Sequence, residues 1–308
     1  MNGKSPTITL NNGVEMPQLG LGVYLSPADQ TSIAVRSAIE NGYRLIDTAA
    51  CYGNEQQVGQ GIADSGAPRE DLFITTKLWI TDYGYDQALR AFDVSMEKLG
   101  LDYLDLYLLH WPCPSDWANT VQAWQAAEKL LADGRIRAIG VCNFTEQHLM
   151  DLASSARIVP AVNQIELHPL FSQPEMRAAN AARGIVTQAW SPIGGVFINH
   201  PREPGNITRV LDTPVLVDIA QRLGKTPAQV VLRWHLQNGV AVIPKSANPD
   251  RIAANIDVFD FTLPDTDMAA INDLNADLRN GPVPDEFDQA MFLRRQQARL
   301  QAESKKNA

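Results

Sequence analysis

Residues 105–110 read DLYLLH, a short apolar run that ends on a histidine. Six more runs of this kind, each ending on a polar or charged residue, are RLID (44–47), LFITTK (72–77), IRAIGVCN (136–143), VPAVNQ (159–164), GIVTQAWS (184–191) and VAVIPK (240–245). Continuous Val, Ile and Leu stretches are typical of parallel strands that are covered on both faces. In a barrel of such strands, the side chains that carry out chemistry lie at the carboxyl ends. The seven runs therefore predict a row of functional residues around one opening.

The segments between these runs have apolar residues at helical spacing, and several are followed by Gly or Asn. We expect helices at 31–41, 54–61, 85–99, 117–132, 146–153, 174–183, 215–223, 227–237 and 249–256. Alternating strands and helices predict a parallel sheet with helices outside it. An eighth strand at 16–24 would close the sheet into a single (β/α)8 TIM barrel domain over 1–308. The Asn12-Gly13 turn predicts an N-terminal β-hairpin at the barrel floor. An open doubly wound sheet is the alternative.

Two segments are less regular than the rest of the chain. Residues 191–210 are rich in Gly, Pro and Asn, which predicts a long loop, and at the barrel mouth such a loop would cover a ligand. Residues 289–308 are helix-prone and highly charged after Leu293, which predicts a helical C-terminal tail. A surface helix is favoured for this tail over a lid or an oligomer contact.

The composition excludes several classes of protein. The chain of 308 residues is 45% hydrophobic and 20% charged, which is ordinary for a globular protein. A net charge of −9 argues against nucleic acid or an anionic membrane as partner. There is no long apolar stretch and no export signal, so we expect a cytoplasmic protein. We also expect a monomer or weak dimer. Cys51, Cys113 and Cys142 are too few and too scattered for a disulfide framework or zinc site. We therefore expect no bound metal.

Asp47, Lys77 and His110 end three successive runs, and Tyr52 follows the first of them by five residues. A phenol with a pKa of about 10 is a poor proton donor near neutrality. A nearby lysine would lower that pKa, and a carboxylate would keep the lysine charged and in place. The histidine could bind the oxygen beside the tyrosine. The group is therefore suited to protonating a carbonyl oxygen, although each residue alone has a structural alternative as a cap, a solvated strand end or a core histidine.

A second group of residues suits a phosphate. Lys245 and Ser246 end the last run, Asn248 precedes the helix at 249–256, and Arg251 lies in its first turn. Two cations, a hydroxyl group and a helix N-terminus are the groups that bind phosphate in proteins. The chain has no GxGxxG motif after a strand, so the Rossmann fingerprint of a dinucleotide site is absent. The alternative is a capped helix with a solvated arginine.

Six motifs resemble the successive signatures of the aldo-keto reductases. The resemblance runs from about residue 7 to 288 and is closest to the bacterial 2,5-diketo-D-gluconate reductase-like branch. It implies an NADPH-dependent carbonyl reductase, which transfers hydride from the nicotinamide to an aldehyde or ketone and gives an alcohol. The motifs are GYRLIDTAACYGNEQQVG (42–59), ITTKLW (74–79), LYLLHWP (106–112), GVCNF (140–144), NQIELHP (163–169) and IPKSANPDRIAANIDVFDF (243–261).

The resemblance also implies roles for individual residues. The residues that match the catalytic tetrad are Asp47, Tyr52 (the proton donor), Lys77 and His110. The residues that match cofactor contacts are Val23, Asn143 and Gln164 (the carboxamide pair), Trp190 (the ring on the nicotinamide), Ser191 (the phosphate bridge), Lys245, Ser246 and Arg251 (the 2′-phosphate) and Asn255 (adenine). Ala254 replaces a glutamate that is common in the family, so a weaker adenine contact is expected.

The resemblance places the substrate pocket among aromatic residues. Tyr24, Trp79 and Trp111 match its rim, and the Phe197 region with Phe287 and Phe292 would set its specificity. The resemblance thereby implies that the C-terminal tail lies near the active-site mouth. Two other functional classes remain open from the sequence. One is a regulatory protein that binds the cofactor with little catalysis. The other is a metal-dependent barrel hydrolase, which the positions of the remaining histidines, mostly in helices and loops, disfavour.

Overall fold

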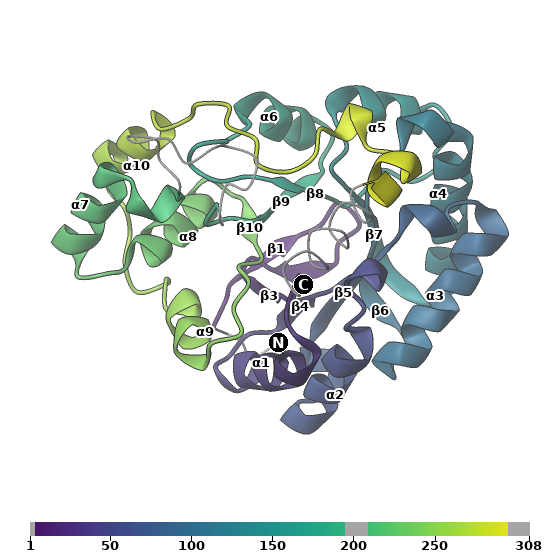
Figure 1. Ribbon diagram of the computed structural model, residues 1–308, viewed down its shortest axis with the longest axis horizontal. Helices are drawn as coiled ribbons and strands as arrows, with labels where there is room; N and C mark the ends of the chain where they lie inside the picture. The colour runs from purple at the N-terminus through teal and green to yellow at the C-terminus, as the bar shows by residue number, and fades with distance from the viewer. Residues whose placement is uncertain (1–3, 195–208, 295–308) are drawn as a thin grey trace, which may run out of the picture.

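The computed structural model describes residues 4–194 and 209–294, and its centre is a ring of parallel strands surrounded by helices (Figure 1). The strands are β3 (Gly20–Gly22), β4 (Leu45–Asp47), β5 (Phe73–Leu78), β6 (Leu104–Leu109), β7 (Ile136–Cys142), β8 (Val162–Glu166), β9 (Val186–Trp190) and β10 (Ala241–Val242). They form one 8-stranded sheet in sequence order from β3 to β10. Parallel bridges from Leu19 to Val242 and from Gly22 to Lys245 join its first and last strands. The sheet is therefore closed, which confirms the (β/α)8 barrel and excludes the open doubly wound sheet.

The strands are buried on both faces, as their continuous apolar runs predicted. Every residue of β5 and β6 is buried. Along β6 the side chains alternate, so that Leu106 and Leu108 belong to the cluster inside the barrel. Tyr107 and Leu109 belong to the larger cluster between the sheet and the helices. This alternation follows from the two-residue period of a strand.

The predicted N-terminal hairpin is present and covers the barrel floor. Its strands β1 (Thr7–Thr9) and β2 (Glu15–Pro17) pair in antiparallel register. Leu10 and Met16 are buried in the same cluster as Phe73, which begins β5. The predicted eighth strand at 16–24 was too long, because its first residues pair in the hairpin and only Gly20–Gly22 joins the barrel. The hairpin plugs the floor and leaves chemistry to the opposite end.

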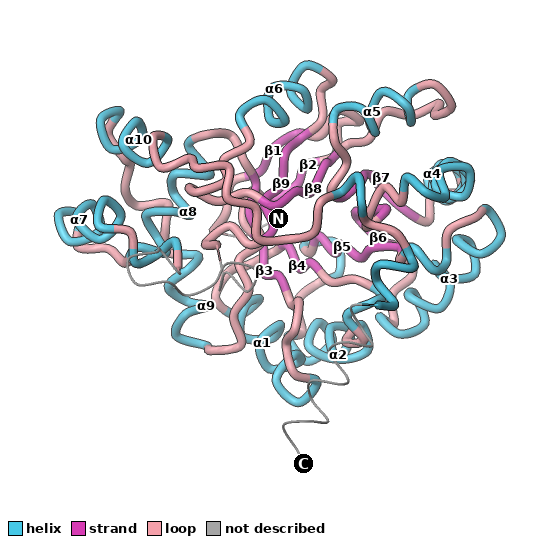
Figure 2. Tube along the Cα trace, turned by 45° about the horizontal axis from the view of Figure 1, so that its top comes forward, coloured by secondary structure: helices cyan, strands magenta, loops and turns pink. Residues whose placement is uncertain are grey.

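A ring of helices covers the outside of the barrel (Figure 2). They are α1 (Ala28–Glu40), α2 (Glu55–Ser65), α3 (Tyr85–Leu99), α4 (Trp117–Ala132), α5 (Glu146–Ala153), α6 (Pro174–Ala182), α7 (Pro214–Leu223), α8 (Pro227–Gln237), α9 (Pro249–Ile256) and α10 (Asp265–Asn272). The expected end of a helix at Gly61 was wrong. A Cβ on Gly61 would lie 2.6 Å from the carbonyl oxygen of Ser32, so this glycine allows α1 and α2 to pack closely. Gly66 at φ 64° ends α2 instead.

The sequence analysis missed α10, and two of its expectations concern residues outside the described part. Pro264 precedes α10 and Asp265 stands in its first turn, a start signal that short helices share with turns. The loop at 191–210 and the tail at 289–308 are described only up to Gly194, from Arg209 and up to Arg294. Within the described part, a helix starts at Gln289. No helix of that part is long and apolar enough to cross a membrane.

His235 in α8 makes stability depend on pH. Its side chain is fully buried, and Nε2 lies 2.9 Å from the carbonyl oxygen of Pro192. Burial lowers the pKa of His235 to about 3. An unfolded histidine has a pKa of about 6.5, so below that pH the unfolded chain binds a proton that the folded chain does not. Stability therefore falls as the pH falls, and we expect His235 to account for a loss of about 1 kcal/mol between pH 6.5 and 5.5.

Urea denaturation at these two pH values measures the effect. The control is His235→Gln, whose side-chain amide can still donate to Pro192 but does not titrate in this range. The variant should lose about 1 kcal/mol less than the natural chain over the same pH step. Equal losses in the two proteins would contradict the assignment.

Candidate active site

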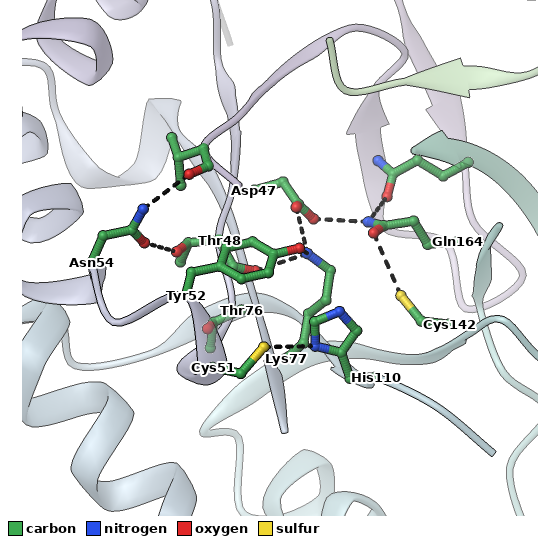
Figure 3. A network of polar contacts seen from close by, with 12 residues as sticks. Asp47, Thr48, Cys51, Tyr52, Asn54, Thr76, Lys77, His110, Cys142 and Gln164 are labelled. Carbon is green, nitrogen blue, oxygen red and sulfur yellow. Dashed lines mark hydrogen bonds and ion pairs between the residues drawn. The ribbon is translucent and has the colours of Figure 1, made fainter. Parts of the chain in front are cut away.

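The four residues predicted to form a catalytic group meet at the carboxyl mouth of the barrel (Figure 3). Asp47 is the last residue of β4, and Lys77 lies near the end of β5. His110 directly follows β6, and Tyr52 ends the short 3-10 helix η1 (Ala50–Tyr52) after β4. The strand order places β4, β5 and β6 side by side, so three neighbouring strand ends and one loop supply the group.

Lys77 is the centre of this group. Its Nζ donates to Asp47 Oδ1 at 2.5 Å, to the carbonyl oxygen of Thr48 at 2.9 Å and to Tyr52 Oη at 3.3 Å. The side chains of Lys77 and Asp47 are 0% and 1% exposed. An ammonium group has three protons to donate, and here all three have an acceptor. The cation is therefore fixed in direction and aimed at the phenol.

The pKa of Tyr52 does not change in the direction predicted from the sequence. Burial raises the pKa of Tyr52 well above 10, and the Asp47 carboxylate raises it further. The net shift is therefore opposite to the predicted one, because desolvation of the phenolate outweighs its stabilisation by the lysine. The consequence is that Tyr52 keeps its proton at neutral pH, while Lys77 stands within hydrogen-bond distance of the oxygen that would carry the negative charge.

His110 is a neutral imidazole at the edge of the same group. Burial lowers the pKa of His110 well below 6.5, and the charge of Lys77 lowers it further. Its Nδ1 lies 3.6 Å from the Sγ of Cys51. The ring stands edge-on to Trp79 at a centroid distance of 5.0 Å and to Tyr52 at 5.7 Å. Neighbouring rings thus hold the imidazole next to the phenol.

Two predicted cofactor residues, Asn143 and Gln164, are joined to the catalytic group. Gln164 Nε2 donates to Asp47 Oδ2 and to Gln188 Oε1, both at 2.8 Å. Asn143 Nδ2 donates to the carbonyl oxygen of His110 at 3.0 Å, and Trp190 Nε1 donates to Asn143 Oδ1 at 2.8 Å. Sequence reasoning missed Gln188, although a polar residue inside an apolar strand was a signal for it.

Asn143 and Ser191 also share an unusual backbone conformation. Asn143 has a φ of 61° and Ser191 a φ of 48°, and both residues directly follow a barrel strand. Non-glycine residues in the left-handed region are uncommon and are found more often at functional sites. Both were predicted to contact the cofactor, and both lie at the carboxyl ends of barrel strands, next to the mouth.

The residues predicted to bind a phosphate lie between β10 and the first turn of α9. Ser246 Oγ accepts from the backbone of Asn248 at 3.1 Å, and Asn248 Oδ1 accepts from the backbone of Arg251 at 3.0 Å. Lys245 and Arg251 are exposed, and within 4–194 and 209–294 neither forms an ion pair. Two cations without an anionic partner at the start of a helix fit the phosphate of a nucleotide. Asn255 is buried near the other end of α9.

The remaining predicted residues line the edge of the mouth. Val23 follows β3, is fully buried and donates its backbone N–H to the carbonyl oxygen of Asp47 at 3.2 Å. Tyr24 is 56% exposed and lies against Tyr52 at a ring distance of 5.0 Å. Trp79 is buried against Phe292 and Trp111 against Phe287, two aromatic residues of the C-terminal segment (280–294).

The C-terminal segment adds a wall to this rim. Phe287 stacks on Trp111 at 4.0 Å with an angle of 21° between the rings. Phe292 stands edge-on to Trp79 at 4.8 Å. This confirms that the tail begins near the active-site mouth. The Phe197 region, which was also expected at the pocket, lies outside the described residues.

A (β/α)8 barrel with this buried polar group at its mouth, and two exposed cations at the start of a helix beside it, has the features of a barrel enzyme that uses a nucleotide. A family profile described as "Aldo/keto reductase family" matches residues 18–276. The chain therefore belongs to the aldo/keto reductase family, as the resemblance predicted.

Individual relatives agree with this assignment. A morphine 6-dehydrogenase of Pseudomonas putida is 57% identical over 293 residues, which cover 95% of this chain and 99% of that protein. A glyoxal reductase of Bacillus subtilis is 50% identical over 282 residues, which cover 91% and 97%. Among solved structures, a Bombyx mori aldo-keto reductase in complex with NADP has a TM-score of 0.84 and 39% identity, and the match covers 92% of this chain and 98% of that one.

The expected enzyme class and cofactor are confirmed by this membership. The chain is an NADP-dependent oxidoreductase that reduces carbonyl compounds, and NADPH is its cofactor. The metal-dependent hydrolase is thereby excluded as the main function. The narrower placement, in the 2,5-diketo-D-gluconate reductase-like branch, stays a prediction.

Proposed function

We propose that this chain reduces an aldehyde or ketone to an alcohol with Tyr52 as the proton donor. NADPH, when bound, supplies the hydride to the carbonyl carbon. Tyr52 protonates the carbonyl oxygen, and its raised pKa keeps the proton available at neutral pH. As the proton leaves, Lys77 Nζ at 3.3 Å stabilises the phenolate. The proposal rests on the three hydrogen bonds that Lys77 Nζ donates, to Asp47, to the carbonyl oxygen of Thr48 and to Tyr52.

The other members of the group hold the donor and the substrate. Asp47 and the carbonyl oxygen of Thr48 fix Lys77, so the cation does not need to reorganise when the phenolate forms. His110 is neutral, so an N–H of its ring can bind the substrate oxygen without competing with Tyr52 for the proton. Burial of the whole group excludes water and strengthens each of these interactions.

The residues at the mouth fit a nicotinamide nucleotide. The Trp190 indole is oriented by Asn143, which makes it a fixed surface for a planar ring. Gln164 Oε1 accepts a long hydrogen bond of 3.4 Å from the Cys142 thiol, and a second lone pair is available for the amide of the carboxamide. Lys245, Ser246 and Arg251 would hold the 2′-phosphate, and Ser191 the phosphate bridge.

Arg251→Ala should weaken binding of NADPH and leave binding of NADH nearly unchanged. A charge-assisted hydrogen bond to a phosphate contributes about 1.5–3 kcal/mol, which corresponds to a rise of about 10- to 100-fold in the KM for NADPH. NADH lacks the 2′-phosphate and has little to lose. Initial rates at varied cofactor concentration measure both constants.

The matched control is Arg90→Ala, which removes an exposed arginine from α3. This variant should change neither KM. An equal rise in the two cofactor constants of Arg251→Ala, or none, would contradict the assignment of Arg251 to the 2′-phosphate.

The substrate class follows from the walls of the pocket. Tyr24, Trp79 and Trp111, with Phe287 of the C-terminal segment, surround one polar corner. Such a pocket favours aldehydes and ketones with an apolar or aromatic group over highly charged compounds. Rates across a panel of aromatic aldehydes, dicarbonyls such as glyoxal, and cyclic ketones, each with NADPH and NADH, test this proposal. Preference for a multiply charged carbonyl would contradict it.

We also propose a single catalytic domain that works in the cytoplasm as a monomer or weak dimer. The net charge of −9 supports a small-molecule carbonyl substrate rather than nucleic acid or a membrane surface as partner.

A further inference from the structure

Glu166 is a buried carboxylate at the mouth to which the reaction described above gives no role. It is the last residue of β8, and its side chain is 0% exposed. Oε1 accepts from the backbone N–H of Asn280 at 2.7 Å, and Oε2 accepts from that of Gly281 at 2.8 Å. The Nε2 of His168 lies 3.3 Å from Oε1. Both oxygens of a buried charge therefore hold the backbone of one distant segment.

That segment lies directly against Trp190. A Cβ built on Gly281 would stand 2.5 Å from Cη2 of the Trp190 indole and 2.9 Å from Oε2 of Glu166. A contact of this kind has no room for a side chain. The hydrogen bond to Glu166 thus holds Gly281 against the edge of the Trp190 ring. Trp190 also donates a hydrogen bond to Asn143, which was predicted to contact the cofactor.

Beyond Gly281 the same segment becomes the wall of the substrate pocket. Asp285 Oδ1 lies 3.3 Å from Nε2 of His148, and Phe287 stacks on Trp111. In Figure 1 the yellow stretch after α10 runs past α6 and α5 to this wall. We call the two hydrogen bonds from Asn280 and Gly281 to Glu166 the Glu166 clamp. Gly281 is only six residues before Phe287 in the sequence. Movement at the clamp therefore reaches the aromatic wall along a short piece of chain, which contains the 3-10 helix η6 (Pro284–Glu286).

We propose that Glu166 is a positioning residue that ties the aromatic wall of the substrate pocket to Trp190. The segment from Asn280 to Phe287 and the indole then form one rigid unit, which fixes the space between the cofactor ring and the wall. The proposal rests on the proposed function in its assignment of Trp190 to the nicotinamide. Its structural part, the clamp, does not depend on that assignment.

The chemistry of a carboxylate suits this task better than that of an amide. Two backbone N–H groups need two acceptor oxygens, and hydrogen bonds to a charged acceptor are the stronger kind. In Glu166→Gln one oxygen becomes an NH2 group, which cannot accept and faces an N–H donor. The substitution therefore breaks one half of the clamp with almost no change of volume.

Hydrogen exchange of the protein without added cofactor tests the clamp itself. In Glu166→Gln, peptides covering 278–284 should exchange at least about 10-fold faster than in the natural chain, because a protected amide loses its acceptor. The matched control is Asp105→Asn. Asp105 is a buried carboxylate in β6 near the barrel floor, and it accepts from the backbone of Ile74 and from two arginines. Unchanged exchange in Glu166→Gln overturns the proposal, as does equally fast exchange of these peptides in Asp105→Asn.

Steady-state kinetics tests the coupling to the pocket. Glu166→Gln should raise the KM for a bulky aromatic aldehyde by about 10-fold and the KM for glyoxal by less than about 2-fold, because only the larger substrate touches the wall. kcat should change less than KM, because the tetrad stays in place. Faster exchange without this difference between substrates overturns the coupling, and so does the same kinetic change in Asp105→Asn.

A second variant covers the case in which Glu166→Gln does not fold. Gly281→Ala leaves the carboxylate in place and forces the segment away from Trp190. It should raise the KM for the bulky aldehyde in the same way, and an unchanged KM overturns the coupling. Exchange at 278–284 reports on the clamp even if a Tyr52 variant were to disprove the proposed reaction, so the two failures are distinguishable.

Discussion

Tyr52→Phe should lower kcat for carbonyl reduction by about 10²- to 10⁴-fold, the range by which a positioned acid accelerates a reaction. The substitution removes only the oxygen that carries the transferred proton. Phenylalanine keeps the ring contacts with Tyr24 and His110 and the ring beneath the Lys77 ammonium at 5.0 Å. The barrel and the phosphate site do not contain this oxygen, so binding of NADPH, measured by quenching of protein fluorescence, should stay within about 2-fold of the natural value.

The matched control is Tyr107→Phe. Tyr107 is a buried tyrosine in β6 on the helix-facing side of the sheet, and its hydroxyl has no hydrogen-bond partner among the residues that the structure describes. It loses the same atom as the Tyr52 variant and should keep full activity. If Tyr52→Phe kept more than about a tenth of the natural kcat, another group would have to supply the proton, and the proposed mechanism would be wrong.

Much of the site could be predicted because short stretches of sequence show where each strand ends and which polar residue stands there. Asp47, Lys77 and His110 each lie at or within one residue of the end of a buried strand, and parallel strands end at one edge of a barrel. Neighbours in the chain are also neighbours in this sheet, so sequence order was enough to bring the three together. The hairpin could be placed at the floor because its turn signal precedes the first barrel strand.

The features that could not be predicted depend on distances across the barrel. Gln164 reaches Asp47 from the opposite side of the ring, over a separation of 117 residues. Glu166 meets Gly281 over 115 residues. The stagger between strands decides the first contact and the path of the chain after α10 decides the second, and no local pattern encodes either. The direction of the pKa shift of Tyr52 could not be predicted either. It depends on whether desolvation of the phenolate outweighs the charge of the lysine, and burial is a property of the assembled mouth.

Lys77→Met should remove nearly all activity and also destabilise the barrel. Methionine has about the length of the lysine stem but carries no charge, so Asp47 would be left buried with only the hydrogen bond from Gln164. Removal of one partner from a buried ion pair costs about 3–5 kcal/mol. Burial already raises the pKa of Asp47, so this carboxyl group can take up a proton, which reduces the free-energy cost of an unpaired buried charge. We therefore expect a loss of about 3 kcal/mol in the free energy of unfolding, measured by urea denaturation, and a fall in kcat of at least about 100-fold.

The double variant Asp47→Asn with Lys77→Met separates the two effects. An amide at position 47 can still accept the hydrogen bond from Gln164 and has no charge to bury, so most of the lost stability should return. Activity should not return, because no cation remains beside the phenolate of Tyr52. Recovered activity in the double variant would mean that Lys77 only neutralises Asp47 and has no direct effect on the tyrosine. We expect the double variant to be a stable barrel that binds NADPH and cannot reduce a carbonyl group, because it lacks the contact of 3.3 Å between Lys77 Nζ and Tyr52 Oη.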